Sequence, residues 1–406
     1  MIRYVFLLLS FSAISSVEAQ NGDPGLTFHT DFEAASLGEI SKLNGNHWQM
    51  ALTGESDSDD RNRQVSWYYF RVEGAKDRPL RLTLSDLVGE YNYRKGSHAI
   101  TSETRPMISY DQKHWTHLPD SAVSWDEQKV QLTFTLLPDR DTIWIAHQPP
   151  YTTENLLSLL KRYEYHPAVK KMELGKTVEQ RSMPLLSITD HSVNIADKKV
   201  VWIMARQHSW ESGTSWLMEG LVHHLLESEQ GTELLKKMHF QLFPMGDPDG
   251  VARGGVRFNT HGHDLNRNWD LVKPVEMPEI HLQKKAIREW LEENHPIDLF
   301  ITLHNTERAD YIQGPDLPVG HGLWEEMVGQ TSFESTEGVR EMPLSTTPGK
   351  PGRMTVNQAL WAEMNIPAYL MELKVEAVDK IDGRRGVEDW LELGRGLLEA
   401  IDKSLR

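Results

Sequence analysis

A histidine and a glutamate three residues apart, His208 and Glu211, follow a short apolar run in the chain. This run, Val200–Ala205, has the continuous apolar character of a buried strand. An imidazole nitrogen and a carboxylate oxygen that turn toward one point form a zinc-type pair, which needs one more nitrogen ligand and leaves a position for water. Because a pair with this spacing arises by chance in many chains, it indicates a metal only together with other residues.

His304 supplies the third candidate ligand. It follows a second apolar run, Asp298–Leu303, which is also typical of a buried strand. The sequence therefore predicts a catalytic site with one Zn²⁺ per chain, held by His208, Glu211 and His304. A single histidine at such a position is otherwise a structural residue, and the metal interpretation depends on the three residues together.

An ionisable residue, Glu372, interrupts a third apolar run, Tyr369–Leu373. A partly desolvated carboxylate beside zinc can act as a general base toward a water at the metal. The alternative is a structural carboxylate that is buried or paired at a sheet edge. With the ligand triad present, we interpret Glu372 as the general base.

Two arginines, Arg257 and Arg267, lie in a loop segment between the candidate ligands that is rich in Gly, Asn and Asp. A guanidinium group is a planar, permanently charged donor that suits a carboxylate or a developing oxyanion. Surface arginines are common, so this signal counts only with the metal and base residues.

The elements that must position these residues follow a prolyl pair, Pro149-Pro150, which marks a boundary in the chain. Beyond it, apolar runs alternate with helical patterns, which predicts an α/β/α domain with a mixed, largely parallel central sheet. In such sheets the ligand crevice lies outside the carboxyl ends of the strands, where the candidate residues would meet. The expected strands are Val200–Ala205, His239–Pro244, Ile297–Leu303 and Ala368–Leu373, and the expected helices are Thr214–Ser228, Pro278–Asn294, Val356–Asn365 and Val387–Leu405.

Short runs with period-two alternation precede the boundary, among them Ser66–Val72, Leu80–Leu84 and Val130–Leu136. They predict an antiparallel β-sandwich. The expected organisation is a signal peptide (1–19), an N-terminal β-sandwich domain (20–150) and an α/β catalytic domain with the zinc site (151–406). An acidic stretch, Glu55–Asp60, is interpreted as a solvated loop, with a calcium loop as the alternative.

The N-terminus has the three-part pattern of a secretory leader. Arg3 precedes the mostly apolar Tyr4–Ile14, and small residues lead to a cleavage site after Ala19. This pattern, with no cysteine in the chain, predicts an exported, periplasmic or secreted protein of bacterial type without a membrane span after leader removal. The net charge of -16 over 406 residues argues against nucleic-acid binding.

The motifs, in their order along the chain, resemble those of the M14 zinc carboxypeptidases, and most closely the cytosolic carboxypeptidase branch. The resemblance runs from about Trp67 to the C-terminus. The motifs that carry it are Arg105–Met107, Pro149–Thr152, His208-x-x-Glu211, Pro248–Val251, Arg257, Asp264–Trp269, His304 and Glu372.

The resemblance implies a role for each motif residue. His208, Glu211 and His304 would be the zinc ligands. Asn266 and Arg267 would hold the free C-terminal carboxylate of the substrate. Arg257 would polarise the scissile carbonyl and stabilise the oxyanion. Glu372 would act as base and then as acid toward the leaving amine.

Two departures from the family pattern concern Trp210 and Asp247. The branch usually has Pro-Gly where this chain has Ser209-Trp210, so the indole is expected to narrow the approach to zinc. Asp247 stands where the branch usually has Asn.

In the glutamate-removing members a basic residue ahead of the Glu372 strand reads the acidic side chain. Lys350 and Arg353 lie near that position, but alignment by Trp361 puts Asn357 closer to it, so acidic specificity stays open.

We therefore expect a zinc-dependent metallocarboxypeptidase that hydrolyses the C-terminal peptide bond of peptides or proteins. Removal of acidic residues such as glutamate is one option within that function. The alternatives are a zinc amidase or deacylase that acts on peptidoglycan peptides or N-acyl amino acids, and a catalytically weak binding protein. The sequence does not predict the oligomeric state.

Overall fold

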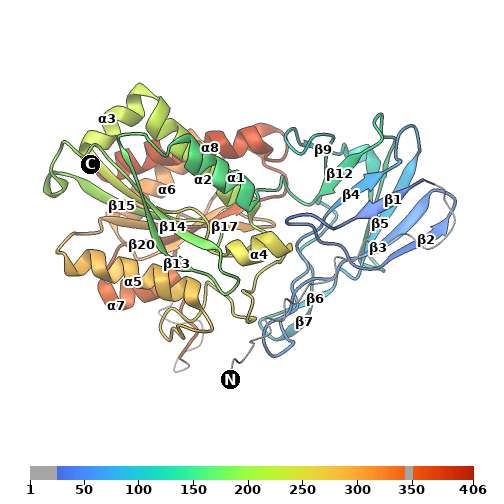
Figure 1. Cartoon of the computed structure of the whole chain (residues 1–406), viewed down its shortest axis with the longest axis horizontal. Helices are drawn as coiled ribbons and strands as arrows, with labels where there is room; N and C mark the ends of the chain where they lie inside the picture. The colour runs from blue at the N-terminus through green and yellow to red at the C-terminus, as the bar shows by residue number, and fades with distance from the viewer. Residues whose placement is uncertain (1–24, 343–350) are drawn as a thin grey trace, which may run out of the picture.

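The computed structural model describes residues 25–342 and 351–406, and Figure 1 shows a β-rich part beside an α/β part. The β-rich part holds the strands from β1 to β12, and the α/β part begins with helix α1 (Thr153–Arg162). This order confirms the predicted α/β chain with an N-terminal β-rich domain. The boundary at residue 150 stays a prediction, and the predicted leader lies outside the described residues.

Two five-stranded sheets form the β-rich part and enclose a core of their own, with Trp48, Phe70 and Phe134 among its members. One sheet has the order β1 (Thr27–His29), β4 (Tyr69–Glu73), β12 (Ile143–Ala146), β8 (Met107–Ser109), β9 (Thr116–His117). The other has the order β10 (Val123–Asp126), β11 (Gln131–Leu136), β5 (Leu80–Ser85), β3 (His47–Ala51), β2 (Ile40–Asn44). The pairing is antiparallel as predicted, except that β3 and β5 are parallel. β6 (Gly89–Tyr91) and β7 (Arg94–Ser97) form a separate two-stranded antiparallel hairpin that belongs to neither sheet.

An eight-stranded mixed sheet forms the centre of the α/β part. Its order is β13 (Val169–Lys176), β14 (Ser182–Ile188), β16 (Met238–Phe243), β15 (Lys199–Met204), β17 (Leu299–Thr306), β20 (Ala368–Lys374), β18 (Tyr311–Gly314), β19 (Val339–Glu341). The central strands β16, β15, β17 and β20 are parallel, whereas β14 and β18 run against their central neighbours. Strand β17 extends beyond the predicted end, so His304 lies inside the strand because its backbone pairs with β20.

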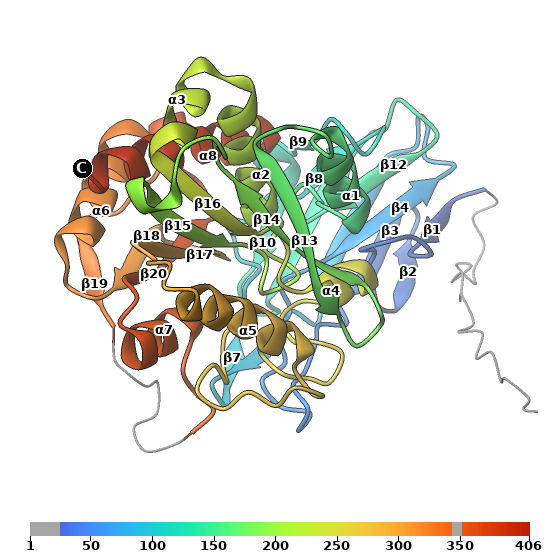
Figure 2. The same cartoon turned by 60° about the vertical axis from the view of Figure 1, so that its left-hand side comes forward.

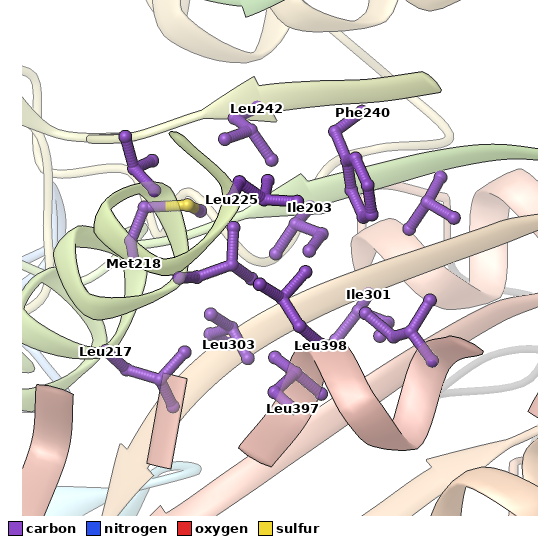
Figure 3. Packing of buried hydrophobic residues seen from close by; sticks show 14 of the residues in the cluster. Ile203, Leu217, Met218, Leu225, Phe240, Leu242, Ile301, Leu303, Leu397 and Leu398 are labelled. Atoms are coloured by element: carbon purple, nitrogen blue, oxygen red, sulfur yellow. The ribbon is translucent and has the colours of Figure 1, made fainter. Parts of the chain in front are cut away.

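Helices cover both faces of this sheet, as Figure 2 shows. One face carries α2 (Ser212–Glu227), α3 (Glu229–Lys237), α6 (Pro318–Gln330) and α8 (Val387–Ser404), and the other carries α5 (Pro278–Glu292) and α7 (Val356–Met364). In Figure 3, Ile203 and Ile301 of the sheet pack with Leu217 of α2 and Leu397 of α8. In the described part of the chain, no helix is long and apolar enough to cross a membrane.

A buried ion pair ties the strand that carries Glu372 to the start of α8. Both nitrogens of the Arg385 fork donate to Asp310, at 3.0 and 2.7 Å, and both side chains have no exposed surface. Asp310 also accepts the backbone N–H of Lys374, at the end of β20. The pair therefore fixes the carboxyl end of β20.

Replacing Arg385 by Met should lower the free energy of unfolding by about 3–5 kcal/mol, because the Asp310 charge would stay buried without a partner. Urea unfolding followed by tryptophan fluorescence measures this loss. Arg395 is a control on the exposed side of α8, where it pairs with Glu392. Arg395→Met should cost less than about 1 kcal/mol. Equal losses in the two variants would contradict the prediction.

Candidate active site and metal centre

The three candidate zinc ligands meet at the carboxyl ends of two adjacent parallel strands. His208 follows β15, where Arg206 adopts a left-handed backbone (φ 59°) that turns the chain, and Glu211 directly precedes α2. His304 lies near the end of β17, which pairs with β15. One donor atom from each residue, His208, Glu211 and His304, lies within 4.8 Å of the others, and all three residues are buried. The structure thus brings together residues that are far apart in the sequence.

Both imidazole rings point the same kind of nitrogen at the Glu211 carboxylate. His208 Nδ1 lies 2.7 Å from Glu211 Oε1, and His304 Nδ1 lies 3.0 Å from Glu211 Oε2. Two imidazole nitrogens and a carboxylate oxygen that converge in this way are the donor set of a catalytic zinc site.

The opposite ring nitrogens are held by oxygen atoms, as metal-binding histidines require. His208 Nε2 lies 3.0 Å from Asp264 Oδ1. His304 Nε2 lies 3.1 Å from Thr302 Oγ1 and 3.2 Å from Gln207 Oε1, and Asn266 Nδ2 also lies 3.2 Å from it. With Nε2 engaged, each ring leaves Nδ1 for a metal, so the residues present fit Zn²⁺.

Asp264 connects the metal centre to Arg257, a link that the sequence motif contained but that sequence reasoning missed. Its Oδ2 accepts a hydrogen bond of 2.8 Å from Arg257 Nε, while Oδ1 faces His208. Burial opposes its ionisation, but the charges of Arg257 and His208 hold the pKa of Asp264 well below the usual value. The carboxylate therefore fixes both a ligand and a candidate catalytic arginine.

Glu372 lies on β20 beside the metal centre. The register of the parallel pair places it next to His304 on β17, and Tyr311 of β18 pairs with it on the other side. Its Oε2 atom is buried and has no hydrogen-bond partner within residues 25–342 and 351–406. Burial and the nearby Glu211 charge raise the pKa of Glu372 well above the usual value. The raised pKa makes the Glu372 carboxylate a stronger base than an exposed carboxylate.

A cleft of about 480 Å³ joins these groups. His208, Glu211, Asn266, Arg257 and Glu372 line it, and Arg267 does so too. The β-rich part supplies a wall that sequence reasoning missed, which includes Arg63, Gln64, Tyr91, Ser97 and His98. All predicted site residues therefore face one cleft or, for His304, lie buried behind it. Their roles stay predictions.

Trp210 packs away from most of the cleft. Its side chain is 4% exposed, and its ring stacks on His147 of the β-rich part with a centroid distance of 5.8 Å. Gln148 Nε2 donates to the Trp210 carbonyl oxygen. The indole lines only part of the cleft and mainly joins the loop that carries His208 to the β-rich part.

Comparisons with known proteins place the chain among metallocarboxypeptidases. A model of the cytosolic carboxypeptidase N-terminal domain matches residues 28–147, and one of zinc carboxypeptidase matches residues 156–312. Human cytosolic carboxypeptidase 1 is 24% identical over 93% of this chain and 34% of its own length. Bovine cytosolic carboxypeptidase 3 is 26% identical over 72% of this chain and 30% of its own length. This chain thus spans about a third of these two relatives.

Solved structures share the fold. A metallo-carboxypeptidase from Burkholderia cenocepacia is 23% identical and superposes with a TM-score of 0.77 over 93% of this chain and 98% of its own. A metallo-carboxypeptidase from Pseudomonas aeruginosa, in complex with (2-guanidinoethylmercapto)succinic acid, is also 23% identical. It superposes with a TM-score of 0.77 over 94% of this chain and 100% of its own. Each part of the chain thus matches a family model of the M14 zinc carboxypeptidases, which confirms the predicted resemblance to this family and to its enzyme class.

The prediction of an exported, periplasmic or secreted protein is wrong. The matching relatives from cattle, human and mouse are named cytosolic carboxypeptidases. The prediction of export depended only on the composition of the first 19 residues. The similarity to cytosolic carboxypeptidases extends over up to 93% of the chain.

Replacing Asp264 by Asn should weaken zinc binding about 10–100-fold. An uncharged amide orients the His208 ring less firmly than a carboxylate does, and it makes the imidazole a weaker ligand. Competition with a coloured chelator measures the zinc affinity. Asp298→Asn is the control, since Asp298 caps the opposite end of the sheet by accepting the N–H of Val200. An unchanged affinity in Asp264→Asn would show that Asp264 does not support the ligand.

Asp247 gives the protein a predictable pH dependence. The residue has no exposed surface, and burial raises its pKa to about 8 from the ordinary 3.8. The folded state therefore keeps a proton that the unfolded state releases, and the stability that this gives is lost as pH rises through about 8. Asn can accept the same Gly250 N–H at the start of α4 (Pro248–Arg253) without a charge.

We expect Asp247→Asn to raise the thermal midpoint relative to wild type more at pH 8 than at pH 5, as measured by scanning calorimetry. Asp197→Asn, at an exposed position, is the control and should show no such difference. A gain for Asp247→Asn that is the same at both pH values would refute the raised pKa.

Proposed function

We propose that this protein is a zinc-dependent metallocarboxypeptidase that hydrolyses the C-terminal peptide bond of peptides or proteins. The observation that carries the proposal is the single cleft that joins a zinc-type donor set to Glu372 and to two arginines. Each of these groups supplies one requirement of the reaction. The match to the family model of zinc carboxypeptidase supports the same function.

His208, Glu211 and His304 would hold one Zn²⁺. When bound, the zinc would supply Lewis-acid activation of water and of the scissile carbonyl. The chain's contribution is to bury the three donors and to fix both rings through their opposite nitrogens.

Arg267 and Asn266 would recognise the free carboxylate of the substrate. Arg267 lines the cleft, and its Nη1 donates to the carbonyl oxygen of Asn266, which orients the guanidinium group. The Asn266 side chain is itself fixed, since its Oδ1 accepts the N–H of Val356 at 3.0 Å. Because a peptide has this carboxylate only at its end, such a clamp selects the last residue.

Arg257 would donate to the scissile carbonyl oxygen as negative charge develops on it. The charge of Asp264 raises the Arg257 pKa against the effect of burial, so the guanidinium stays charged inside the cleft. A preorganised donor of this kind lowers the barrier by about 3 kcal/mol.

Glu372 would take one proton from water as the oxygen attacks the carbonyl carbon. It would then pass that proton to the nitrogen as the C–N bond breaks, which leaves a neutral amine and returns the carboxylate. Burial and the Glu211 charge, which raise the pKa of Glu372, suit a group that must hold the proton between the two steps.

The test is release of single C-terminal residues from a mixed peptide library, read by mass spectrometry with and without a chelator. Chelator-sensitive loss of terminal residues is the expected result, and the residues released would show whether acidic side chains such as glutamate are preferred. No release by zinc-loaded protein would overturn the proposal and favour a zinc amidase or deacylase, or a binding role.

Glu372→Gln should retain zinc but lower kcat by about 10²–10⁴-fold, because the amide cannot accept the proton. Glu376→Gln is the matched control, since Glu376 lies beyond β20 and accepts a hydrogen bond from Thr101. Zinc content by metal analysis and kcat on a released-residue assay are the measurements. A Glu372→Gln variant with the wild-type rate would remove the residue from the proposed mechanism.

A further inference from the structure

We propose that Glu55, a residue of the β-rich part, is a positioning residue for Arg257. Its carboxylate fixes the backbone from which Arg257 extends toward the scissile carbonyl. The inference rests on the proposed function of Arg257. It assigns the β-rich part a direct share in the geometry of the catalytic cleft.

One carboxylate oxygen of Glu55 accepts three consecutive backbone N–H groups. Oε2 lies 2.9 Å from the nitrogen of Val256, 2.6 Å from that of Arg257 and 2.8 Å from that of Phe258. Oε1 accepts a hydrogen bond of 2.7 Å from Arg253 Nη2. Successive N–H groups that converge on one point form an anion-binding nest, and here the anion comes from the chain itself, about 200 residues earlier.

The backbone of the same segment is built for this close approach. Gly254 has a left-handed φ of 69°, and a Cβ there would lie 2.2 Å from the carbonyl oxygen of Ala35. A Cβ on Gly255 would lie 3.0 Å from Glu55 Oε1. The two glycines therefore let the segment lie directly against the β-rich part.

Glu55 is itself held in place. Its backbone exchanges two hydrogen bonds of 2.8 Å with Gln64, and its side chain is 16% exposed. Gln64 lines the cleft on the same side. The acidic stretch that includes Glu55 is thus not wholly a solvated loop, because this carboxylate has four donors from the α/β part.

The anchored segment reaches the metal centre by two contacts. The Val256 carbonyl oxygen accepts the N–H of Trp210, in the loop that carries His208, at 3.1 Å. Arg257 Nε donates to Asp264, which faces His208. Glu55 therefore fixes the backbone of Arg257, and Asp264 fixes its side chain. A shift of about 1 Å in such a group can cost about 10²-fold in rate.

A carboxylate suits this position better than an amide. Three N–H donors converge on one oxygen, and a negative charge strengthens all three hydrogen bonds. Glu55→Gln keeps the size of the side chain but loses that charge. Glu55→Asp keeps the charge on a shorter side chain, so it should lose less activity than Glu55→Gln.

Glu103→Gln is the matched control. Glu103 also joins the two parts of the chain, since its carbonyl oxygen accepts from Arg384 Nε and its carboxylate lies 3.5 Å from Arg384 Nη2. Its hydrogen bonds go to Thr101 and Arg384, away from the segment around Arg257, so this variant reports the cost of weakening the interface elsewhere.

The first experiment compares these variants as zinc-loaded full-length proteins. We expect Glu55→Gln to lower kcat at least ~10-fold with little change in KM, since loss of an oxyanion-stabilising donor costs about 10²–10³-fold. Amide hydrogen exchange at Val256, Arg257 and Phe258 should become faster in Glu55→Gln. Glu103→Gln should change neither quantity. Unchanged exchange at these three amides would overturn the proposal even without an activity assay.

The second experiment separates positioning from general destabilisation. In an Arg257→Ala background, Glu55→Gln should cause no further loss of kcat, because the group that it positions is gone. Losses that multiply in the double variant would overturn the proposal. If Arg257→Ala alone leaves kcat unchanged, the proposed function of Arg257 fails, whereas a loss in Arg257→Ala with none in Glu55→Gln refutes only the positioning role.

Discussion

The register of the parallel strands β15, β17 and β20 is the constraint on which the rest of the site depends. Backbone hydrogen bonds place His304 beside Glu372, and they place the chain after β15 at the same edge of the sheet. Because side chains alternate between the faces of a strand, a slip of one residue would turn Glu372 away from the metal centre. The buried cores on both faces of the sheet prevent such a slip.

The sequence was sufficient for the parts of the site that depend on local pattern. Apolar runs located β15, β17 and β20, and the residues at their ends gave the donor set and the candidate base. The end of β17 was misplaced, since pairing with β20 carries the strand through His304. An apolar run shows where a strand is buried, but it does not show how far the polar residues that follow continue the strand.

The contacts that support the site were not predictable in the same way. Glu55 belongs to an acidic stretch that has the composition of a solvated loop, and its partners lie about 200 residues further along the chain. Asp264 was visible in the motif, but only the folded chain shows that its two oxygens face different groups. Such residues act through long-range geometry, which leaves no periodic signal in the sequence.

The two parts of the chain have hydrophobic cores of their own but share one cleft and one buried cluster, and this has a consequence for how the protein loses its activity. The β-rich part and the α/β part each bury their own apolar cluster, so each can in principle unfold as its own cooperative unit. Both parts line the cleft. Heat inactivation should therefore follow the weaker of the two units. Where that unit is the β-rich part, activity would disappear while the sheet that carries His208 and His304 is still folded.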